Sequence, residues 1–155
     1  MTDITRILSP QCVRVAVEAS SRKRVLHYTS DILAEAHPAL SARKVFDELA
    51  SRERLGSTGL GEGVAIPHCR IACEEIIGAF VTLKTAVDYD AIDDQPVDLL
   101  FVLIVPPTET TAHLDLLAAL ARLFGEADNR NKLRNVHSNP ELYEKLVGMF
   151  SRQAA

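Results

Sequence analysis

The run VDLLFVLIV, from Val97 to Val105, limits the folds open to this chain more than any other segment. Its residues are almost all aliphatic or aromatic and do not alternate with polar ones, which is typical of a strand covered on both faces. The run IIGAFVTLK, from Ile76 to Lys84, has a similar composition and predicts a second strand. Turn residues in DAIDDQP separate the two runs. A strand covered on both faces needs packed elements on each side of its sheet.

Other segments show the apolar spacing of amphipathic helices. They are residues 20–37, 41–55, 113–124, 127–136 and 139–150. Ser41 and Asn139 are expected to cap the N-termini of their helices, and Gly56 is expected to end the helix that Ser41 begins. The residue before a proline disfavours helix, so His37-Pro38 ends the first segment. Helices interleaved with strands predict an α/β fold in a single domain, residues 1–155.

Composition excludes several classes of function. The net charge of -4 argues against a nucleic-acid-binding protein that works by bulk electrostatic attraction. The N-terminus has no basic segment followed by an apolar one, and no apolar run approaches the roughly 20 residues of a membrane span. The three cysteines, Cys12, Cys69 and Cys73, are expected to be free thiols in a reducing compartment. We therefore expect a cytoplasmic protein with no nucleic-acid partner and no direct membrane insertion.

Cys69 and Cys73 lie beside His68, which raises the question of a zinc site. A closed structural zinc site needs four ligands, and the chain has no second pair of ligands at close spacing. We expect no metal and no cofactor, and interpret the two cysteines as small side chains.

The segment STGLGEGVAIPHCR, residues 57–70, contains glycines at alternate positions, Gly59, Gly61 and Gly63. This spacing matches neither the Walker pattern nor the Rossmann pattern. Glycine nevertheless lets backbone N–H groups approach a ligand closely, and successive N–H groups form an anion-binding nest. With the hydroxyls of Ser57 and Thr58, these residues are predicted to bind phosphate. The alternative is an ordinary connecting loop.

His68 follows Ile66-Pro67, in which the proline ring restricts the backbone of both residues. A neutral imidazole is a good nucleophile near neutral pH when a hydrogen bond holds its other nitrogen. A fixed imidazole beside an anion nest suits reversible phosphoryl transfer. The residues alone leave a second interpretation open, in which His68 is an ordinary loop histidine.

The segment SRERLGSTGLGEGVAIPH resembles the phosphorylation-site signature of the type 2 EIIA domains of the bacterial phosphotransferase system, the fructose/mannitol group. The resemblance covers most of the chain and extends to ILSPQCV, SRKRVL, AIDDQPVDLLFVLIVP and HLDLLAALARLF. Within the family, the chain looks most like the nitrogen-regulatory members. The resemblance implies one EIIA type 2 domain, residues 1–155, with a mixed β-sheet flanked by helices on both faces.

The resemblance also implies roles for particular residues. His68 would accept a phosphoryl group from the phosphohistidine of an HPr-type carrier (NPr). Arg52 would help to hold the phosphate with its forked guanidinium, and His113 would lie beside His68. The residues alone favour a different interpretation, in which Arg52 is a solvated charge at a helix end and His113 a partly buried histidine in the cap region of a helix. Glu62 is expected to face solvent, and Arg70 to offset Glu62 or meet an acidic partner.

The function implied is that of a regulatory phosphoryl carrier in a nitrogen phosphotransferase system, not a metabolic enzyme of the usual kind. Its targets would be proteins such as potassium-transport or sensor-kinase components. One alternative is a transport EIIA that passes the phosphoryl group to an EIIB cysteine. Another is a binding module that is never phosphorylated. The presence of His68, Arg52 and His113 together counts against this last alternative.

Overall fold

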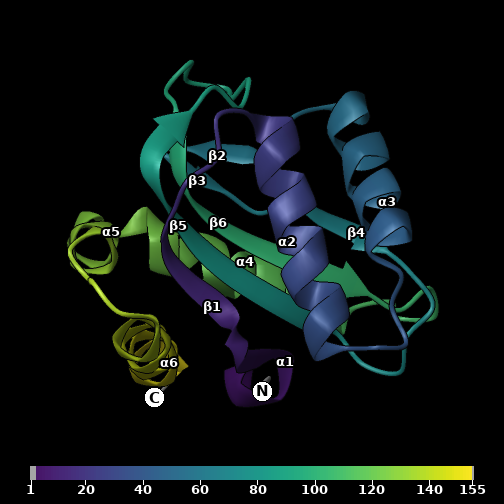
Figure 1. The fold of residues 1–155 in the computed structure, drawn as a ribbon. Helices are drawn as coiled ribbons and strands as arrows, with labels where there is room; N and C mark the ends of the chain where they lie inside the picture. The colour runs from purple at the N-terminus through teal and green to yellow at the C-terminus, as the bar shows by residue number, and fades with distance from the viewer. Residues whose placement is uncertain (1–2, 155) are drawn as a thin grey trace.

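The computed structural model describes residues 3–154, which form one mixed β-sheet between two layers of helices (Figure 1). The strands are β1 (Leu8–Val17), β2 (Gly59–Gly61), β3 (Val64–Ala65), β4 (His68–Arg70), β5 (Ile77–Val87) and β6 (Val97–Val105). The helices are α1 (Ile4–Ile7), α2 (Arg22–Ala36), α3 (Ala42–Leu55), α4 (Ala112–Gly125), α5 (Ala127–Arg134) and α6 (Asn139–Ala154). The predicted α/β class and mixed sheet are confirmed.

The sheet has the order β1-β5-β6-β3-β2, and β4 pairs with β6 beyond β3. β5 and β6 are antiparallel, β1 runs parallel to β5, and β3 and β4 both run parallel to β6. β3 and β4 are thus two parts of one extended segment that Ile66-Pro67 interrupts. Pro67 has no N–H group to donate, although its carbonyl accepts from the Leu103 N–H at 2.9 Å.

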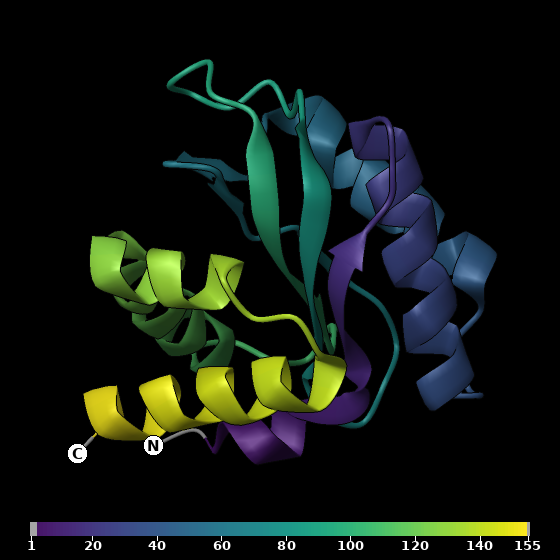
Figure 2. The same ribbon diagram turned by 60° about the vertical axis from the view of Figure 1, so that its left-hand side comes forward.

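β6 is buried on both faces, as its composition predicts. Its alternate residues divide between two apolar cores, as the two-residue period of a strand requires. Leu100, Val102 and Ile104 pack with residues of α2 and α3. Leu99, Phe101, Leu103 and Val105 pack with residues of α1, α4, α5 and α6. Figure 2 shows the sheet nearly edge-on between these two layers.

The helices begin and end close to the predicted residues. Ser41 caps α3 through its hydroxyl, which accepts from the Lys44 N–H at 3.3 Å, and Gly56 follows its last residue. The predicted cap of α6 is wrong. The Glu141 N–H donates to the Ser138 hydroxyl at 3.3 Å, whereas the Asn139 side chain accepts from the Val15 N–H of β1 at 2.8 Å. None of the helices in residues 3–154 is long and apolar enough to cross a membrane.

The sequence prediction missed β1 and the three short strands. β1 contains Pro10 and a register shift between Leu8 and Val13, so its alternation of apolar residues is broken. It lies at the edge of the sheet, where a proline is tolerated. β2, β3 and β4 all lie in the glycine-rich segment, where local sequence favours turns.

Gly61 and Gly63 form the tight turn that joins β2 to β3, in which three successive residues have positive φ. The values are 96° at Gly61, 58° at Glu62 and 81° at Gly63. The Arg134 guanidinium closes the turn, because it donates to the Glu62 carbonyl at 2.8 Å and to both carboxylate oxygens of Asp98. The turn and its arginine set the position of the segment that leads to His68.

Gly63→Ala is expected to lower the free energy of unfolding by about 2 kcal/mol. The new methyl group would sit at a positive φ, within 3.0 Å of an Asp98 carboxylate oxygen and against the Arg134 guanidinium. Chemical denaturation followed by circular dichroism measures the loss. Gly125→Ala is the matched control, since a methyl group there meets no atom within 4 Å. Equal stability of the two variants would contradict the role given to the turn.

Candidate functional site

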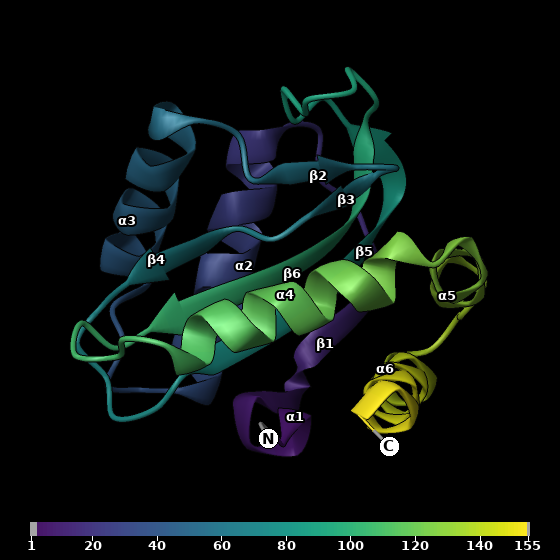
Figure 3. The ribbon, with the colours of Figure 1, turned by 180° about the vertical axis from the view of Figure 1, so that it is seen from behind.

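A cavity of about 480 Å³ opens where α3, β4 and the start of α4 meet. β4 pairs with β6 and lies at an edge of the sheet, so helices from both faces of the sheet reach it (Figure 3). The side chains that line the cavity are those of Glu48, Ser51, Arg52, Leu55, His68, Cys69, Arg70, Val105 and His113. The structure therefore brings together the three residues Arg52, His68 and His113, which come from separate segments of the chain.

The His68 ring is held in one tautomer by a backbone carbonyl two residues earlier in the chain. Its Nδ1 lies 2.8 Å from the carbonyl oxygen of Ile66. A carbonyl only accepts hydrogen bonds, so Nδ1 carries the hydrogen and donates it. The lone pair of the neutral ring is then on Nε2. The pairing of β4 with β6, in which His68 lies opposite Leu103, fixes the backbone that carries this ring.

Arg52 lies in the last turn of α3, and its guanidinium is anchored by a neutral acceptor. Its Nη1 donates to the Gly56 carbonyl at 2.8 Å, which also satisfies a carbonyl just beyond the helix end. Among the ion pairs of the described residues, none involves Arg52, so its positive charge is not neutralised by a carboxylate. The side chain is thus oriented at the cavity and remains available to an anion.

His113 is the second residue of α4 and interacts with Arg70 of β4. Its Nε2 lies 3.4 Å from the Nη2 of Arg70, whose Nη1 donates to the carbonyls of Pro106 and Glu109 at 2.9 and 2.8 Å. Glu62 faces solvent as expected, but its ion pair is with Arg130, at 3.6 Å. The prediction that Arg70 offsets Glu62 is therefore wrong, because Arg70 binds the segment that leads into α4.

The glycine-rich loop does not lie at the cavity, and the prediction that it forms a phosphate-binding nest does not fit the structure. Ser57, Thr58, Gly59, Gly61 and Gly63 are all absent from the lining. Polar groups of the first three bond within the protein: the Thr58 N–H to Glu53, the Gly59 N–H to the Ser57 hydroxyl, and that hydroxyl to the Tyr89 carbonyl. The glycines are needed for the turn into β3 and for close packing, since a methyl group on Gly59 would lie 2.8 Å from the Ala91 methyl group.

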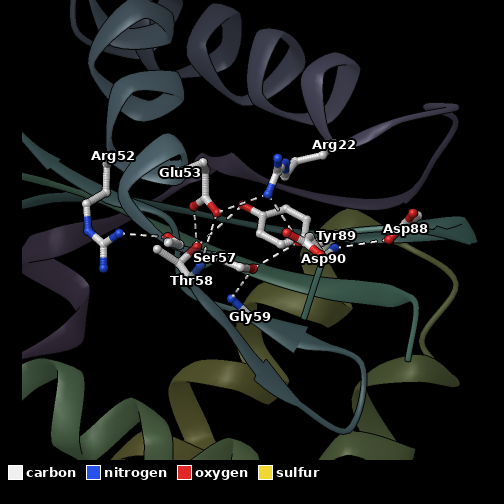
Figure 4. Close-up of polar contacts among 10 residues, drawn as sticks. Arg22, Arg52, Glu53, Ser57, Thr58, Gly59, Asp88, Tyr89 and Asp90 are labelled. Atoms are coloured by element: carbon white, nitrogen blue, oxygen red, sulfur yellow. Dashed lines mark hydrogen bonds and ion pairs between the residues drawn. The ribbon is translucent and has the colours of Figure 1, made fainter. Parts of the chain in front are cut away.

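A buried polar cluster lies behind Arg52, around the carboxylate of Glu53 (Figure 4). Glu53 is 5% exposed and accepts from both the N–H, at 3.0 Å, and the hydroxyl of Thr58. The Arg22 guanidinium lies 3.8 Å from this carboxylate and over the ring of Tyr89. The cluster joins the end of α3 to the start of α2, to the loop before β2 and to the segment after β5. It thereby fixes the last turn of α3, which carries Arg52.

Two side chains near the site have raised pKa values. Burial raises the pKa of the Tyr89 hydroxyl well above its usual range, and the Glu53 carboxylate adds to this effect. Burial, with a smaller contribution from Glu48, raises the pKa of the Cys69 thiol to about 12. Cys69 is therefore a neutral thiol at physiological pH and a poor nucleophile. Within residues 3–154, no group of three or more His, Cys, Asp or Glu side chains is placed to hold a metal ion.

Sequence reasoning missed the parts played by Glu53 and Arg70. Glu53 stands between two arginines in SRERL, a pattern that predicts a solvated helix end. Its position one turn after Leu49, which is buried, is the available signal that it faces the core. Arg70 follows His68 by two residues, and alternation along a strand places both on the same side. That signal can be used only once β4 is recognised as a strand.

The sequence model of the family described as phosphoenolpyruvate-dependent sugar phosphotransferase system, EIIA 2, matches residues 6–147. The chain belongs to this EIIA 2 family. The resemblance inferred from the glycine-rich segment and the long buried strand is thus confirmed.

Known relatives of this EIIA chain support the same assignment. A nitrogen regulatory protein of Pseudomonas aeruginosa is 42% identical to it over 154 residues, which cover 99% of this chain and 100% of the relative. The crystal structure of nitrogen regulatory protein IIA-Ntr from Neisseria meningitidis has a TM-score of 0.87 and 38% identity, and covers 96% of this chain and 99% of that one. The crystal structure of IIA mannitol from Escherichia coli shares the fold, with a TM-score of 0.69 at 15% identity over 88% of this chain and 94% of that one.

Glu53→Ala in this EIIA chain is expected to lower the free energy of unfolding by about 3 kcal/mol. The substitution leaves the buried N–H of Thr58 without an acceptor and leaves its hydroxyl only the Tyr89 hydroxyl, at 3.5 Å. It also removes the carboxylate that faces Arg22. Urea denaturation measures the loss.

Glu48→Ala is the matched control, since Glu48 is an exposed glutamate on the same helix. Its unfolding free energy is expected to stay within about 0.5 kcal/mol of wild type. A Glu53→Ala variant as stable as Glu48→Ala would show that the buried cluster does not hold the end of α3.

Proposed function

We propose that this EIIA protein is a regulatory phosphoryl carrier that accepts a phosphoryl group on Nε2 of His68 from the phosphohistidine of an HPr-type carrier such as NPr. The observation that carries the proposal is the hydrogen bond from His68 Nδ1 to the Ile66 carbonyl, at 2.8 Å, in a ring that lines the cavity with Arg52 and His113. This bond leaves Nε2 as the nucleophilic nitrogen of a neutral imidazole.

In the proposed step, the Nε2 lone pair of His68 attacks the phosphorus atom of the carrier's phosphohistidine. A bond forms between phosphorus and Nε2 while the bond between phosphorus and the carrier's ring nitrogen breaks. The electron pair of the broken bond returns to the carrier's imidazole, so the reaction needs no external oxidant or base. The Ile66 carbonyl stabilises the positive charge that develops on the His68 ring, because it accepts the Nδ1 hydrogen.

Arg52 is proposed to bind the phosphoryl oxygens, and His113 to confine the phosphoryl group. The guanidinium of Arg52 offers forked donors and a permanent charge, and its bond to the Gly56 carbonyl leaves further N–H groups for phosphate. His113 comes from the opposite face of the sheet and would bracket the phosphoryl group from the α4 side. The oriented donors of Arg52 lower the barrier without reorganising during the reaction, and a fixed ring at His113 keeps the phosphoryl group in line with His68 Nε2.

The carrier is proposed to dock on the rim of the cavity, where two large apolar side chains are exposed. Leu55, at the end of α3, is 86% exposed, and Leu114, next to His113, is 56% exposed. A docked partner would bury both and exclude water from the transfer. A phosphoryl group on His68 adds about -2 charges at this surface, so partners that pack against the rim would distinguish the two forms.

Regulation is favoured over the transport alternative because the Pseudomonas and Neisseria relatives both carry nitrogen-regulatory names. We place the protein in the cytoplasm, where phosphoenolpyruvate is made. Potassium-transport or sensor-kinase components are the targets we propose for it.

His68→Gln is expected to abolish phosphorylation, because the amide has no nucleophilic nitrogen. The measurement is intact mass after incubation with phosphoenolpyruvate, enzyme I and an HPr-type carrier. Wild type is expected to gain one acid-labile phosphoryl group. His137→Gln, which changes an exposed histidine outside the cavity, is expected to gain the same mass. Uptake of phosphate by His68→Gln at the wild-type rate would rule the assignment out.

Arg52→Ala is expected to slow phosphoryl transfer about 100-fold, the size seen when one preorganised donor to a developing charge is removed. His113→Ala is expected to slow it about 10-fold, because the ring that confines the phosphoryl group on the α4 side is lost. Rapid-quench kinetics with the phosphorylated carrier measure both rates. Arg54→Ala is the control for charge on the same helix, because Arg54 is exposed and donates to Ser51. If Arg54→Ala slows phosphoryl transfer as much as Arg52→Ala does, the loss comes from the change in overall charge and not from a specific contact of Arg52 with phosphate.

A further inference from the structure

The guanidinium of Arg70 bonds to four acceptors, all within residues 106–113. Nη1 donates to the carbonyls of Pro106, Pro107 and Glu109 at 2.9, 3.4 and 2.8 Å, and Nη2 lies 3.4 Å from His113 Nε2. We propose that Arg70 is a positioning residue for His113: it fixes the tautomer of the His113 ring and the start of α4. The proposal rests on the proposed function, in which His113 acts on the phosphoryl group.

The strand register explains why Arg70 reaches this segment. Arg70 is the last residue of β4 and lies opposite Val105, the last residue of β6. The chain leaves the sheet immediately after Val105, so the residues from Pro106 onward lie beside the Arg70 side chain. Alternation along β4 places Arg70 on the same side of the strand as His68, and both side chains line the cavity.

The backbone bonds of Arg70 hold the turn that precedes α4. In this turn the Glu109 N–H donates to the Pro106 carbonyl at 3.1 Å. Pro106 and Pro107 have no N–H groups of their own, so neither can add a backbone hydrogen bond as donor. A guanidinium that donates to three carbonyls of one turn supplies charge-assisted bonds in their place. Arg70 thus stabilises the particular conformation in which the turn enters α4.

Glu109 transmits this position to the helix. Its carboxylate accepts from the N–H groups of Thr110 and Ala112 at 3.2 and 2.9 Å. Thr111, at the N-cap position, makes no side-chain cap bond, so Glu109 takes over the capping of α4. Arg70 holds the carbonyl of the same Glu109. The arginine, the capping glutamate and the first turn of α4, which carries His113, therefore form one connected unit.

The contact with Arg70 also determines the tautomer of the neutral His113 ring. A guanidinium only donates, so Nε2 of His113 accepts and the hydrogen of the neutral ring is on Nδ1. Nδ1 is buried and has no hydrogen-bond partner within residues 3–154. An N–H group buried without a partner is unfavourable by about 1–3 kcal/mol. The contact with Arg70 is thus what favours the tautomer with hydrogen on Nδ1. Without the guanidinium, nothing offsets the unfavourable burial of the Nδ1–H group.

The first test is the tautomer itself, read by long-range proton–nitrogen NMR of the histidine rings in the unphosphorylated protein. We expect wild type to show His113 with hydrogen on Nδ1 and an unprotonated Nε2. Arg70→Met keeps an unbranched apolar stem without donors, and we expect its His113 to shift toward the tautomer with hydrogen on Nε2. Arg70→Lys retains a charged donor and is expected to keep the wild-type signals of His113.

Arg14→Met is the matched control, since Arg14 of β1 also donates to a backbone carbonyl, that of Gln11, at 3.2 Å. Its His113 signals are expected to match wild type. An Arg70→Met protein that retains the wild-type tautomer of His113 overturns the proposal. This result does not depend on phosphoryl transfer, so the proposal can fail while the proposed function stands, and it can hold if the function fails.

The second test is a double-mutant cycle for transfer from the phosphorylated carrier. We expect Arg70→Met to slow transfer about 10-fold, the same factor as His113→Ala, because the His113 ring is no longer fixed where it confines the phosphoryl group. If Arg70 acts through His113, the double variant is no slower than His113→Ala alone. Arg70→Lys is expected to recover most of the rate. Additive losses, about 100-fold in the double variant, would mean that Arg70 acts independently of His113 and would overturn the positioning role.

Discussion

β6 is the element on which the rest of the structure depends, because it is paired along both edges and covered on both faces. The strand from Val97 to Val105 needs a layer of helices on each face, since its alternate residues belong to two different apolar cores. Its carboxyl end then fixes the candidate site. His68 lies opposite Leu103, Arg70 lies opposite Val105, and α4 with His113 follows the same strand after one turn. The three side chains are positioned by one rigid strand.

Two polar anchors complete this arrangement, one on each side of β4. On the α3 side, the buried Glu53 carboxylate binds Thr58 and faces Arg22, which fixes the last turn of the helix that carries Arg52. On the α4 side, Arg70 binds the turn from Pro106 to Glu109, and the Glu109 carboxylate caps the helix. Each anchor joins a helix end to an element that is distant in sequence. Hydrophobic packing alone is non-directional and would position the helix ends less narrowly.

The sequence predicted those features that depend on local pattern, namely the long helices, the two long strands and the burial of β6 on both faces. It failed where distant contacts decide. The glycines suggested an anion nest, but Gly61 and Gly63 have positive φ in a tight turn and Gly59 packs against Ala91. Asn139 has the composition of a cap, yet its side chain bonds to Val15 of β1. Arg52, His68 and His113 were named together through the family resemblance, since spacing alone does not bring them to one cavity.

Arginines held by carbonyls suit an anion site better than arginines held by carboxylates, and this chain contains both kinds. Arg22, Arg130 and Arg134 lie within 4 Å of Glu53, Glu62 and Asp98, so their charges are largely compensated. Arg52 and Arg70 are instead oriented by the carbonyls of Gly56, Pro106 and Glu109. A carbonyl directs a guanidinium without removing its net charge, so both arginines remain charged beside His68. A dianionic group that enters can bind Arg52 without first displacing a carboxylate from it, while Arg70 holds the turn that leads to His113.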